Sequence, residues 1–422
     1  MTSSQIVERV EPMGMLVPDC TLAGESRADG AVPAHPNGIP LSKNRFLILY
    51  TTRGFRGRDD EWSGVYRLVA DGWEGPLIKE GYLCQTTNDW RLFNDERAYV
   101  RQVGHPTAIG VPKGALVNGR RVAHENCFLA MWRQVARCID RSGHVCWTDE
   151  DPEAVAVSTA AHALQFRLND AEDDIEITQP IRPLRQRGYE TGDQICERSD
   201  VKSVVKGYVA GVPCNAEFTE WVDMNSVSGD SAGRFGGDPA TSTSSWTIPF
   251  KYRWNPDTAL YEWVACGQPL GPDLFEGSIA RYKGSYVIHA RMLGFEGHGF
   301  TDRGEYTRVA VWCRTVDPFG EKPHPVRPRE QPNWFPTCAF TLPDGSLVRI
   351  GNCPHINYRR ARAPLFLVHI DPEDGFRATE TVELRDTHME PRIHVPLPER
   401  PYLDFGKLLP HTGGKTELTQ MK

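Results

Sequence analysis

Short runs of apolar and aromatic residues, bounded by turn residues, recur along the whole chain. Alternate side chains of a strand point to opposite faces, and β-branched and aromatic residues favour that geometry, so these runs are typical of β-strands. They predict strands at Arg45–Thr51, Gly64–Val69, Cys127–Trp132, Ser203–Val209, Trp246–Trp254, Tyr261–Ala265, Ser285–Ala290, Thr307–Cys313, Ser346–Ile350 and Leu365–Ile370. The helical pattern is weak, and its best candidate is Asp151–Leu168, whose β-branched residues suit a strand equally well.

Turn residues separate many of these runs in pairs. Asp-Gly and Asn-Gly dipeptides favour the positive φ that tight hairpins need. They occur at Asp71-Gly72, Asn118-Gly119, Asp344-Gly345 and Asp374-Gly375, and Lys283-Gly284 is a further example. Strand-turn-strand units return about every 40–60 residues, which favours a β-propeller over a sandwich or two β-domains. We expect an all-β fold, a β-propeller with six blades and with seven as the alternative.

The propeller is expected to occupy residues 31–410 as one domain. Residues 1–30 would form an extension or a strand that closes the propeller, and residues 411–422 a polar tail. No linker of low complexity interrupts the middle of the chain. The Gly-, Ser- and Thr-rich segment Asn225–Ser245 is predicted to be a long loop within the domain.

Charge and composition exclude several classes of protein. The chain has 422 residues, and its 48 Lys and Arg against 55 Asp and Glu give a net charge of −7, which argues against nucleic acid as a partner. No apolar run reaches the length of a membrane span, so no membrane partner is expected. The first residues lack the apolar stretch of a secretory signal, which favours a cytoplasmic location.

The cysteines and the short motifs argue against metals and cofactors. The 11 cysteines are scattered singly and form no Cys-x-x-Cys pair, as expected of free thiols rather than a zinc ribbon or a disulfide framework. Neither a GxGxxG motif, nor a P-loop, nor HExxH is present. We therefore expect no metal and no cofactor. The oligomeric state does not follow from the sequence.

Three segments combine charged residues with predicted strand ends. In Phe275–Met292, Glu276 precedes a predicted strand, a Lys283-Gly284 turn follows, and Arg291 ends the returning strand. A carboxylate and a guanidinium at the ends of adjacent strands could bind or activate a charged sugar.

The other two segments flank predicted strands in the same way. His35–Arg67 carries Arg53, Asp59 and Asp60 after a strand, a usual place for an acid catalyst. Trp334–Ile370 carries Arg360 and Arg362 in a loop before a strand, where bidentate arginines suit a carboxylate. Each segment alone would also suit a solvated turn.

Taken in order, these segments resemble the bacterial sialidase-like, or BNR-repeat, β-propeller family. The resemblance rests on Ile39-Pro40, on Glu276-Gly277-Ser278 before a hairpin that ends in Arg291, on Pro343-Asp344-Gly345, and on Ala363-Pro364-Leu365. It implies a six-bladed propeller whose sialidase members cleave terminal sialic acids without metal or organic cofactor. A carbohydrate is then the expected partner. The expected activity is that of an exo-acting, sialidase-like glycoside hydrolase that acts on an acidic or polar terminal sugar.

The resemblance also implies roles for individual residues. Glu276 takes the position of the carboxylate that activates a tyrosine nucleophile, and Tyr402 is the late candidate for that nucleophile. Asp59 or Asp60 would be the acid/base catalyst.

Three arginines hold the substrate carboxylate in the family. Arg291 takes the second position, and Arg362 the third, with Arg360 as a close alternative. The first lies in an Arg-Ile-Pro triplet, which here reads Gly38-Ile39-Pro40. Arg53 could substitute for it, and His35 could shape the pocket on that side.

Two other functions remain open at this stage. A propeller lyase acting on uronate-containing glycans would use a histidine or tyrosine base with a cation, for which His105, His124, Tyr208 and Arg133 are candidates. A non-catalytic propeller that binds a glycan or a protein is the other alternative.

Overall fold

The structure is a computed structural model. It describes residues 10–15, 32–41, 44–53, 61–72, 75–84, 91–94, 97–109, 116–117, 120–121, 128–140, 145–146, 161–183, 201–206, 211–229, 245–267, 270, 274–292, 309–320, 326, 338–342, 344–352, 365–385 and 417–421. Within these ranges the secondary structure consists of strands and turns, which confirms the prediction of an all-β fold.

Two large antiparallel sheets come from the N-terminal half of the chain. The first has the strand order β2-β3-β4-β5, with β2 Val32–Pro40, β3 Arg45–Arg53, β4 Glu61–Ala70 and β5 Leu77–Cys84. The second has the order β13-β12-β10-β7-β6, with β6 Arg91–Asn94, β7 Arg97–Ile109, β10 Phe128–Asp140, β12 Ala161–Leu168 and β13 Ile175–Pro183; β11 (Val145–Cys146) pairs with β10. In the chain between β7 and β10, β8 (Leu116–Val117) and β9 (Arg120–Arg121) pair on either side of the predicted Asn118-Gly119 turn.

Three further antiparallel sheets come from the C-terminal half. The first has the order β14-β16-β17-β18, with β14 Val201–Lys206, β16 Glu220–Gly229, β17 Ser245–Asn255 and β18 Leu260–Cys266; β15 (Val212–Pro213) pairs with β16. The next is β19 Leu274–Tyr282, β20 Ser285–Met292 and β21 Val309–Thr315, and the last is β22 Cys338–Thr341, β23 Leu347–Asn352, β24 Leu365–Asp371 and β25 Arg377–Arg385. Near the chain ends, β1 (Val10–Met15) pairs with β26 (Glu417–Met421).

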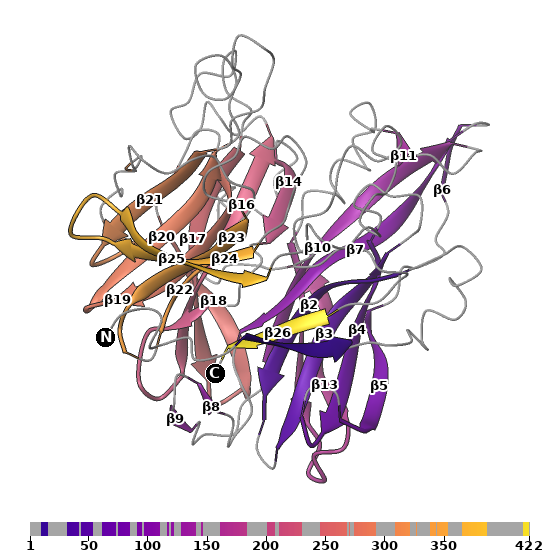
Figure 1. Cartoon of the computed structure of the whole chain (residues 1–422). Coiled ribbons are helices and arrows are strands. Elements are labelled where there is room, and N and C mark those ends of the chain that lie inside the picture. Colours follow the sequence, from indigo (N-terminus) through magenta and orange to yellow (C-terminus); the bar gives the residue numbers. More distant parts are fainter. Residues whose placement is uncertain are drawn as a thin grey trace.

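These sheets form a propeller arrangement, in which each sheet packs on the next along the chain. β4 contacts β7, β10 contacts β14, β16 contacts β19, and β19 contacts β22. Figure 1 shows the N-terminal sheets, indigo to magenta, on one side of the molecule and the C-terminal sheets, pink to orange, on the other. The predicted count of six blades, or seven, is wrong for the part of the chain described, which forms four sheets of four or more strands and one of three.

The helix considered for Asp151–Leu168 is also corrected. Ala161–Leu168 is strand β12, and residues 151–160 lie outside the described residues. The physical reason is tertiary, because β12 is paired on both edges, with β10 and with β13. Its aromatic residue Phe166 is fully buried between these neighbours. Strand pairing and burial thus determine the secondary structure of this stretch, whose local sequence pattern suited both a helix and a strand.

The hydrophobic core lies between successive sheets. One cluster joins β16 with β19, β20 and β21, and a second joins the same three-stranded sheet with β22–β25. Alternation along β20 serves both clusters, because Ile288 faces the first and Val287 the second. The three-stranded sheet is therefore buried on both faces, and side-chain packing fixes its position.

Two turns, one in each half of the chain, are built in the same way by an asparagine. The side-chain oxygen of Asn169 accepts hydrogen bonds from the backbone N–H groups of the fourth and fifth residues after it, at 3.0 and 3.3 Å, and Asn215 does the same at the same distances. The third residue after each has a positive φ, 56° at Glu172 and 58° at Phe218. The asparagine thus supplies the turn with bonds that offset an unfavourable backbone conformation.

Candidate functional site

The candidate residues from the sequence fall into two groups. The structure describes the backbone, but not the side chains, of His35 on β2, Arg53 on β3, His105 on β7, Glu276 on β19 and Arg291 on β20. Outside the described residues lie Asp59, Asp60, His124, Tyr208, Arg360, Arg362 and Tyr402.

Four of the five large sheets have a hairpin end, where short turns join two strands, and an open end opposite to it. In the second sheet short connections lie at both ends, β6–β7 at one and β12–β13 at the other. At the hairpin ends of the last two sheets, the turn at Lys283-Gly284 lies against the turn that contains Glu373. Arg314 on β21 forms an ion pair with Glu373 at 2.9 Å, and Lys283 approaches the same carboxylate at 4.0 Å. These contacts hold the two hairpin ends together.

The strands of these two sheets also run side by side. The backbone N–H of Ala339 on β22 donates to Oγ of Ser278 on β19 at 3.1 Å, and further toward the hairpin end Oγ1 of Thr341 donates to the carbonyl of Arg281. β22 and β19 therefore run in the same direction, and the open ends of the two sheets lie next to each other. Strand ends from both sheets meet there. Among them are Asn352, the last residue of β23, and Leu365, the first residue of β24, which pair with each other. The predicted arginines lie between these two residues in the chain.

Glu276 and Arg291 come together at this open end. The register pairs Phe275 with Arg291 and Ser278 with His289, so that Glu276 and Gly277 on β19 oppose a single residue, Ala290, on β20. This is a β-bulge, and it places the backbone of Glu276 beside that of Arg291 on the neighbouring strand. The backbones of a carboxylate residue and of an arginine residue thus lie side by side near the ends of adjacent strands.

Two further candidate residues lie in bulges of the same kind. His35-Pro36 opposes only Tyr50, and His105-Pro106 opposes only Trp132. Proline has no N–H to give to the ladder, so a bulge is one of the positions in a strand that tolerate it. Bulges are common next to active sites, where they redirect a side chain. The sequence signal for both is a His-Pro dipeptide.

Arg53 lies at the open end of the first sheet. It is the last residue of β3 and pairs with Val32 and with Glu61, the first residue of β4. The candidate acids Asp59 and Asp60 immediately precede Glu61 in the chain. Every hydrolase candidate on a described strand therefore occupies the open half of its sheet.

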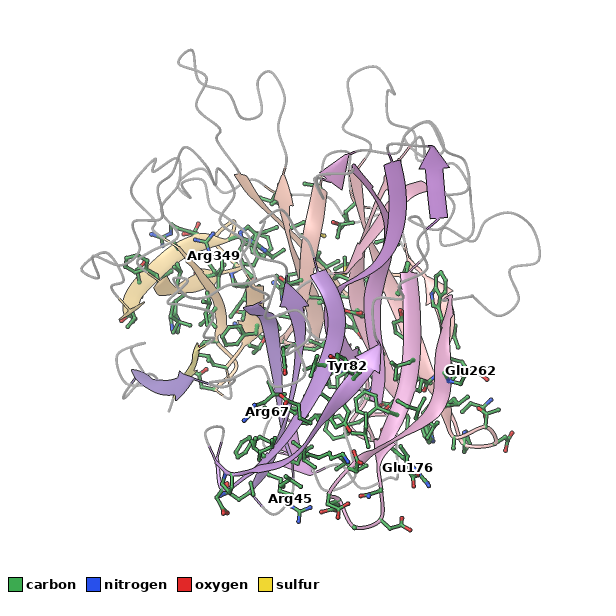
Figure 2. The ribbon with its side chains drawn as sticks, turned by 90° about the vertical axis from the view of Figure 1, so that its right-hand side faces the viewer. Arg45, Arg67, Tyr82, Glu176, Glu262 and Arg349 are labelled. Atoms are coloured by element: carbon green, nitrogen blue, oxygen red, sulfur yellow. The ribbon has the colours of Figure 1, made fainter. Side chains whose placement is uncertain are left out.

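A buried polar layer lies between the last two sheets, below Glu276 and Arg291. It consists of Ser278, His289 and Arg349, which are 3%, 2% and 1% exposed. His289 lies two residues before Arg291 on β20. Its ring packs edge-on against the ring of Trp312, with 4.5 Å between the ring centroids. Arg349 is in β23, opposite Ala339 of β22, and Figure 2 shows it in the last sheet, well away from Arg45 and Glu176 at the bottom of that view.

Burial decides the charge states in this layer. Loss of solvation, with the positive charge of Arg349 nearby, lowers the pKa of His289 to about 3. Burial alone lowers the pKa of Arg349 to about 9, so Arg349 is charged and His289 neutral at pH 7. The layer thus keeps a positive charge in the interior, next to the sheet end where an acidic ligand is predicted.

Sequence reasoning missed this layer. His289 and Arg349 were assigned only to predicted strands, and Ser278 only to the Glu276-Gly277-Ser278 motif. The available signal was a polar residue inside an apolar strand, since Arg349 lies between Val348 and Ile350. Such a residue in a strand buried on both faces is unusual and indicates a structured polar environment.

The described residues show no group of histidine, cysteine and acidic residues arranged to hold a metal ion. Two cysteines in these ranges, Cys214 and Cys313, are free thiols, and burial raises the pKa of Cys313 to about 12. In the same part of the chain, no helix has the length and apolar character to cross a membrane.

Comparison with known proteins identifies the fold. No protein-family model and no curated protein sequence matches the chain. Among solved structures, a Trypanosoma rangeli sialidase in complex with the inhibitor DANA is similar with a TM-score of 0.53 and 10% identity, over 85% of this chain and 49% of that one. A Dyadobacter fermentans protein of unknown function is similar with a TM-score of 0.50 and 12% identity, over 89% of this chain and 87% of that one.

A Hadza microbial sialidase has a TM-score of 0.48 and 11% identity, over 84% of this chain and 59% of that one. The chain thus spans about half the length of the trypanosomal sialidase and nearly all of the Dyadobacter protein. At these identities the likeness concerns the fold. The chain has a sialidase-like β-propeller fold.

Proposed function

We propose that the protein is a sialidase-like, exo-acting glycoside hydrolase that acts on a terminal acidic sugar. The observation that carries the proposal is the bulge on β19, which sets Glu276 beside Arg291 at the open end of a sheet. The similarity in fold to a sialidase supports it. A carboxylate next to a guanidinium at a strand end suits an enzyme that binds an anion and moves a proton.

Arginines would recognise the sugar through its carboxylate. Arg291 at the open end and Arg362, or Arg360, in the adjoining segment would hold the two carboxylate oxygens. Arg53, at the open end of the first sheet, would take the place of the arginine absent from Gly38-Ile39-Pro40. His35, in its bulge, would line the same side.

The chemistry would proceed by double displacement through a tyrosine. Glu276 would accept the phenolic proton of Tyr402 as the phenolate oxygen attacks the anomeric carbon. Asp59 or Asp60 would give its proton to the departing glycosidic oxygen. In the second half, the same aspartate would take a proton from water, whose oxygen attacks the anomeric carbon. The bond to the tyrosine oxygen breaks, and Glu276 would return its proton to that oxygen.

The test is a turnover screen on sialosides and uronate-terminated oligosaccharides. Reducing ends and the ultraviolet absorbance of unsaturated uronates are followed together in the wild type and in Glu276→Gln, Arg291→Met and His105→Ala. Glu176→Gln, an exposed carboxylate on β13, is the matched control. We expect reducing ends without absorbance, lost in Glu276→Gln, weakened in Arg291→Met through a higher KM, and retained in the control.

Other results would replace the proposal. Absorbance that depends on His105 would make the protein a lyase with its site in the second sheet. Saturable binding of an acidic glycan without turnover would favour a non-catalytic propeller.

A further inference from the structure

The bulge that carries Glu276 is wedged against the preceding sheet. Gly277 is buried, and a Cβ atom added to it would lie 2.4 Å from Cγ2 of Thr247 on β17 and 3.4 Å from Cβ of Met224 on β16. The first distance is shorter than any van der Waals contact between carbons. Only glycine therefore lets β19 approach β17 this closely.

Thr247 cannot easily give way. It is fully buried, its backbone N–H donates to the carbonyl of Leu270 at 2.8 Å, and its carbonyl accepts from the N–H of Leu270 at 2.7 Å. It is also paired with Ser226 on β16. A methyl group at position 277 would consequently push β19 rather than β17.

The other side of the bulge is tied to the following sheet. Ser278 is 3% exposed, and its Oγ accepts the backbone N–H of Ala339 on β22, which is fully buried. Ser278, the residue after the bulge, is thus held by a hydrogen bond to β22. Gly277, within the bulge, is held by its close contact with β17. β19 is fixed from both neighbours within two residues of Glu276.

We propose that Gly277 and Ser278 are positioning residues, which set the place of Glu276 relative to Arg291 by fixing the bulge between two sheets. The inference rests on the proposed function, since it assumes that Glu276 acts in catalysis. A small shift of β19 would move Glu276 away from the reacting atoms while Arg291, on β20, stays with the substrate. Misplacement by about 1 Å is enough to lower a rate roughly 100-fold.

The main test compares two glycine variants that create the same kind of clash. Gly277→Ala places a methyl group against Thr247, and Gly81→Ala on β5 places one 2.5 Å from Cε1 of Tyr66, in a different sheet. Folded fraction and melting temperature are measured alongside kcat and KM. We expect Gly277→Ala to lose roughly 10- to 100-fold in kcat with KM nearly unchanged, and Gly81→Ala to keep its kcat while losing stability.

A rescue variant isolates the contact. Thr247→Ser removes the methyl group that the new side chain would meet and retains the hydroxyl. The double variant Gly277→Ala/Thr247→Ser should recover most of the lost kcat, whereas a general loss of structure would not be reversed by making a buried residue smaller.

A second pair of variants tests the hydrogen bond between Ser278 and Ala339. This pair can be used even if Gly277→Ala does not fold. Ser278→Ala removes the link between β19 and β22 near Glu276, and Thr341→Val removes the link between the same strands near the hairpin end, to the carbonyl of Arg281. We expect kcat to fall in Ser278→Ala and to remain within about twofold of wild type in Thr341→Val.

The outcomes separate the two proposals. Wild-type turnover that Gly277→Ala and Ser278→Ala leave unchanged overturns the positioning role alone. Equal losses in each variant and its matched control, in proportion to the folded fraction, also overturn it. Failure of the wild type to hydrolyse any acidic glycoside overturns the proposed function, and the positioning role with it.

Discussion

The hairpin ends and the open ends of the sheets are built on different principles. At the hairpin ends, short turns satisfy their own backbone groups, and ion pairs such as Arg314–Glu373 and Lys79–Asp174 join neighbouring sheets. Irregularities of register occur at both ends, for example at Leu68/Val69 and at His369/Ile370 near hairpin turns. The bulges that carry the hydrolase candidates His35 and Glu276 lie in the open halves of their sheets, and the bulge at His105 lies within β7.

This difference separates stability from reactivity along each strand. Regular turns bring ordered hydrogen bonds and leave little room for chemistry. Bulges give up ladder bonds and redirect side chains, and they are retained where the packing around them is strong. Between the two ends lies the buried layer of Ser278, His289 and Arg349. Substitutions at the hairpin ends, and of His289 and Arg349 in this layer, should therefore change the free energy of unfolding. Substitutions at the open ends, and of Ser278, which fixes the bulge, should change turnover.

The largest effect on stability is expected from Arg349→Ala. Arg349 is the buried cation between the last two sheets, 1% exposed, and truncation leaves a cavity and disrupts a polar environment built around a charge. We expect a loss of about 3–5 kcal/mol in the free energy of unfolding, measured by urea titration. Arg377→Ala, whose side chain is 52% exposed, is the control and should cost less than about 1 kcal/mol. If Arg349→Ala kept its stability and lost kcat, the buried layer would instead act in function together with the open ends.

The next effect depends on pH and tests His289. Its folded pKa of about 3 lies below the value of about 6.5 in an unfolded chain. Above pH 6.5 neither state binds the proton, and between pH 6.5 and 3 only the unfolded state does, so stability falls as the pH falls. The loss should reach about 2–3 kcal/mol at pH 4.5 relative to pH 7. In His289→Gln this part of the slope should disappear, and an unchanged slope would show that His289 is accessible to protons in the folded protein.

A smaller effect distinguishes a buried carboxylate from an exposed one. Glu80 on β5 is 4% exposed in its side chain, lies 3.3 Å from Arg67, and accepts a hydrogen bond from the Tyr50 hydroxyl at 2.7 Å. Glu80→Gln removes the charge from both contacts and should cost about 1–3 kcal/mol. Glu176→Gln breaks the pair with Arg167, which is half exposed on both sides, and should cost no more than about 0.5 kcal/mol. Similar costs at both positions would mean that burial does not govern these pairs.

The sequence predicted the regular end of the sheets well. Dipeptide signals marked turns whose backbone has the expected positive φ, at Asp71, at Lys283-Gly284, at Gly345 and at Gly375. These signals are local, because the type of residue in a turn is enough to show that a positive φ is tolerated there. The predicted strands were found for the same reason, from side-chain alternation within a few residues.

The blade count and the buried layer could not be obtained in that way. Whether Ala161–Leu168 is a strand depends on its pairing with β10 and β13, which no local pattern encodes. The place of Arg349 between two sheets depends on how those sheets pack. The adjacency of Glu276 and Arg291 was within reach, because a single hairpin fixes it, but the bulge at Gly277 was not, because a contact with Thr247 from another sheet explains it.

The smallest effect compares one turn in two settings. Asn169 and Asn215 hold equivalent turns, and either substitution to alanine removes two hydrogen bonds to the backbone. The turn of Asn215 also presents the buried Phe218, whose carbonyl accepts from Nε1 of Trp221 and from the hydroxyl of Tyr261. Asn215→Ala should therefore cost about 1–2 kcal/mol and Asn169→Ala about 1 kcal/mol or less, by urea titration. Turnover per folded molecule should be unchanged in both, because both turns lie at hairpin ends; a fall in kcat in either variant would show that the two ends of the strands are coupled, and that stability and reactivity are less separate than the contacts indicate.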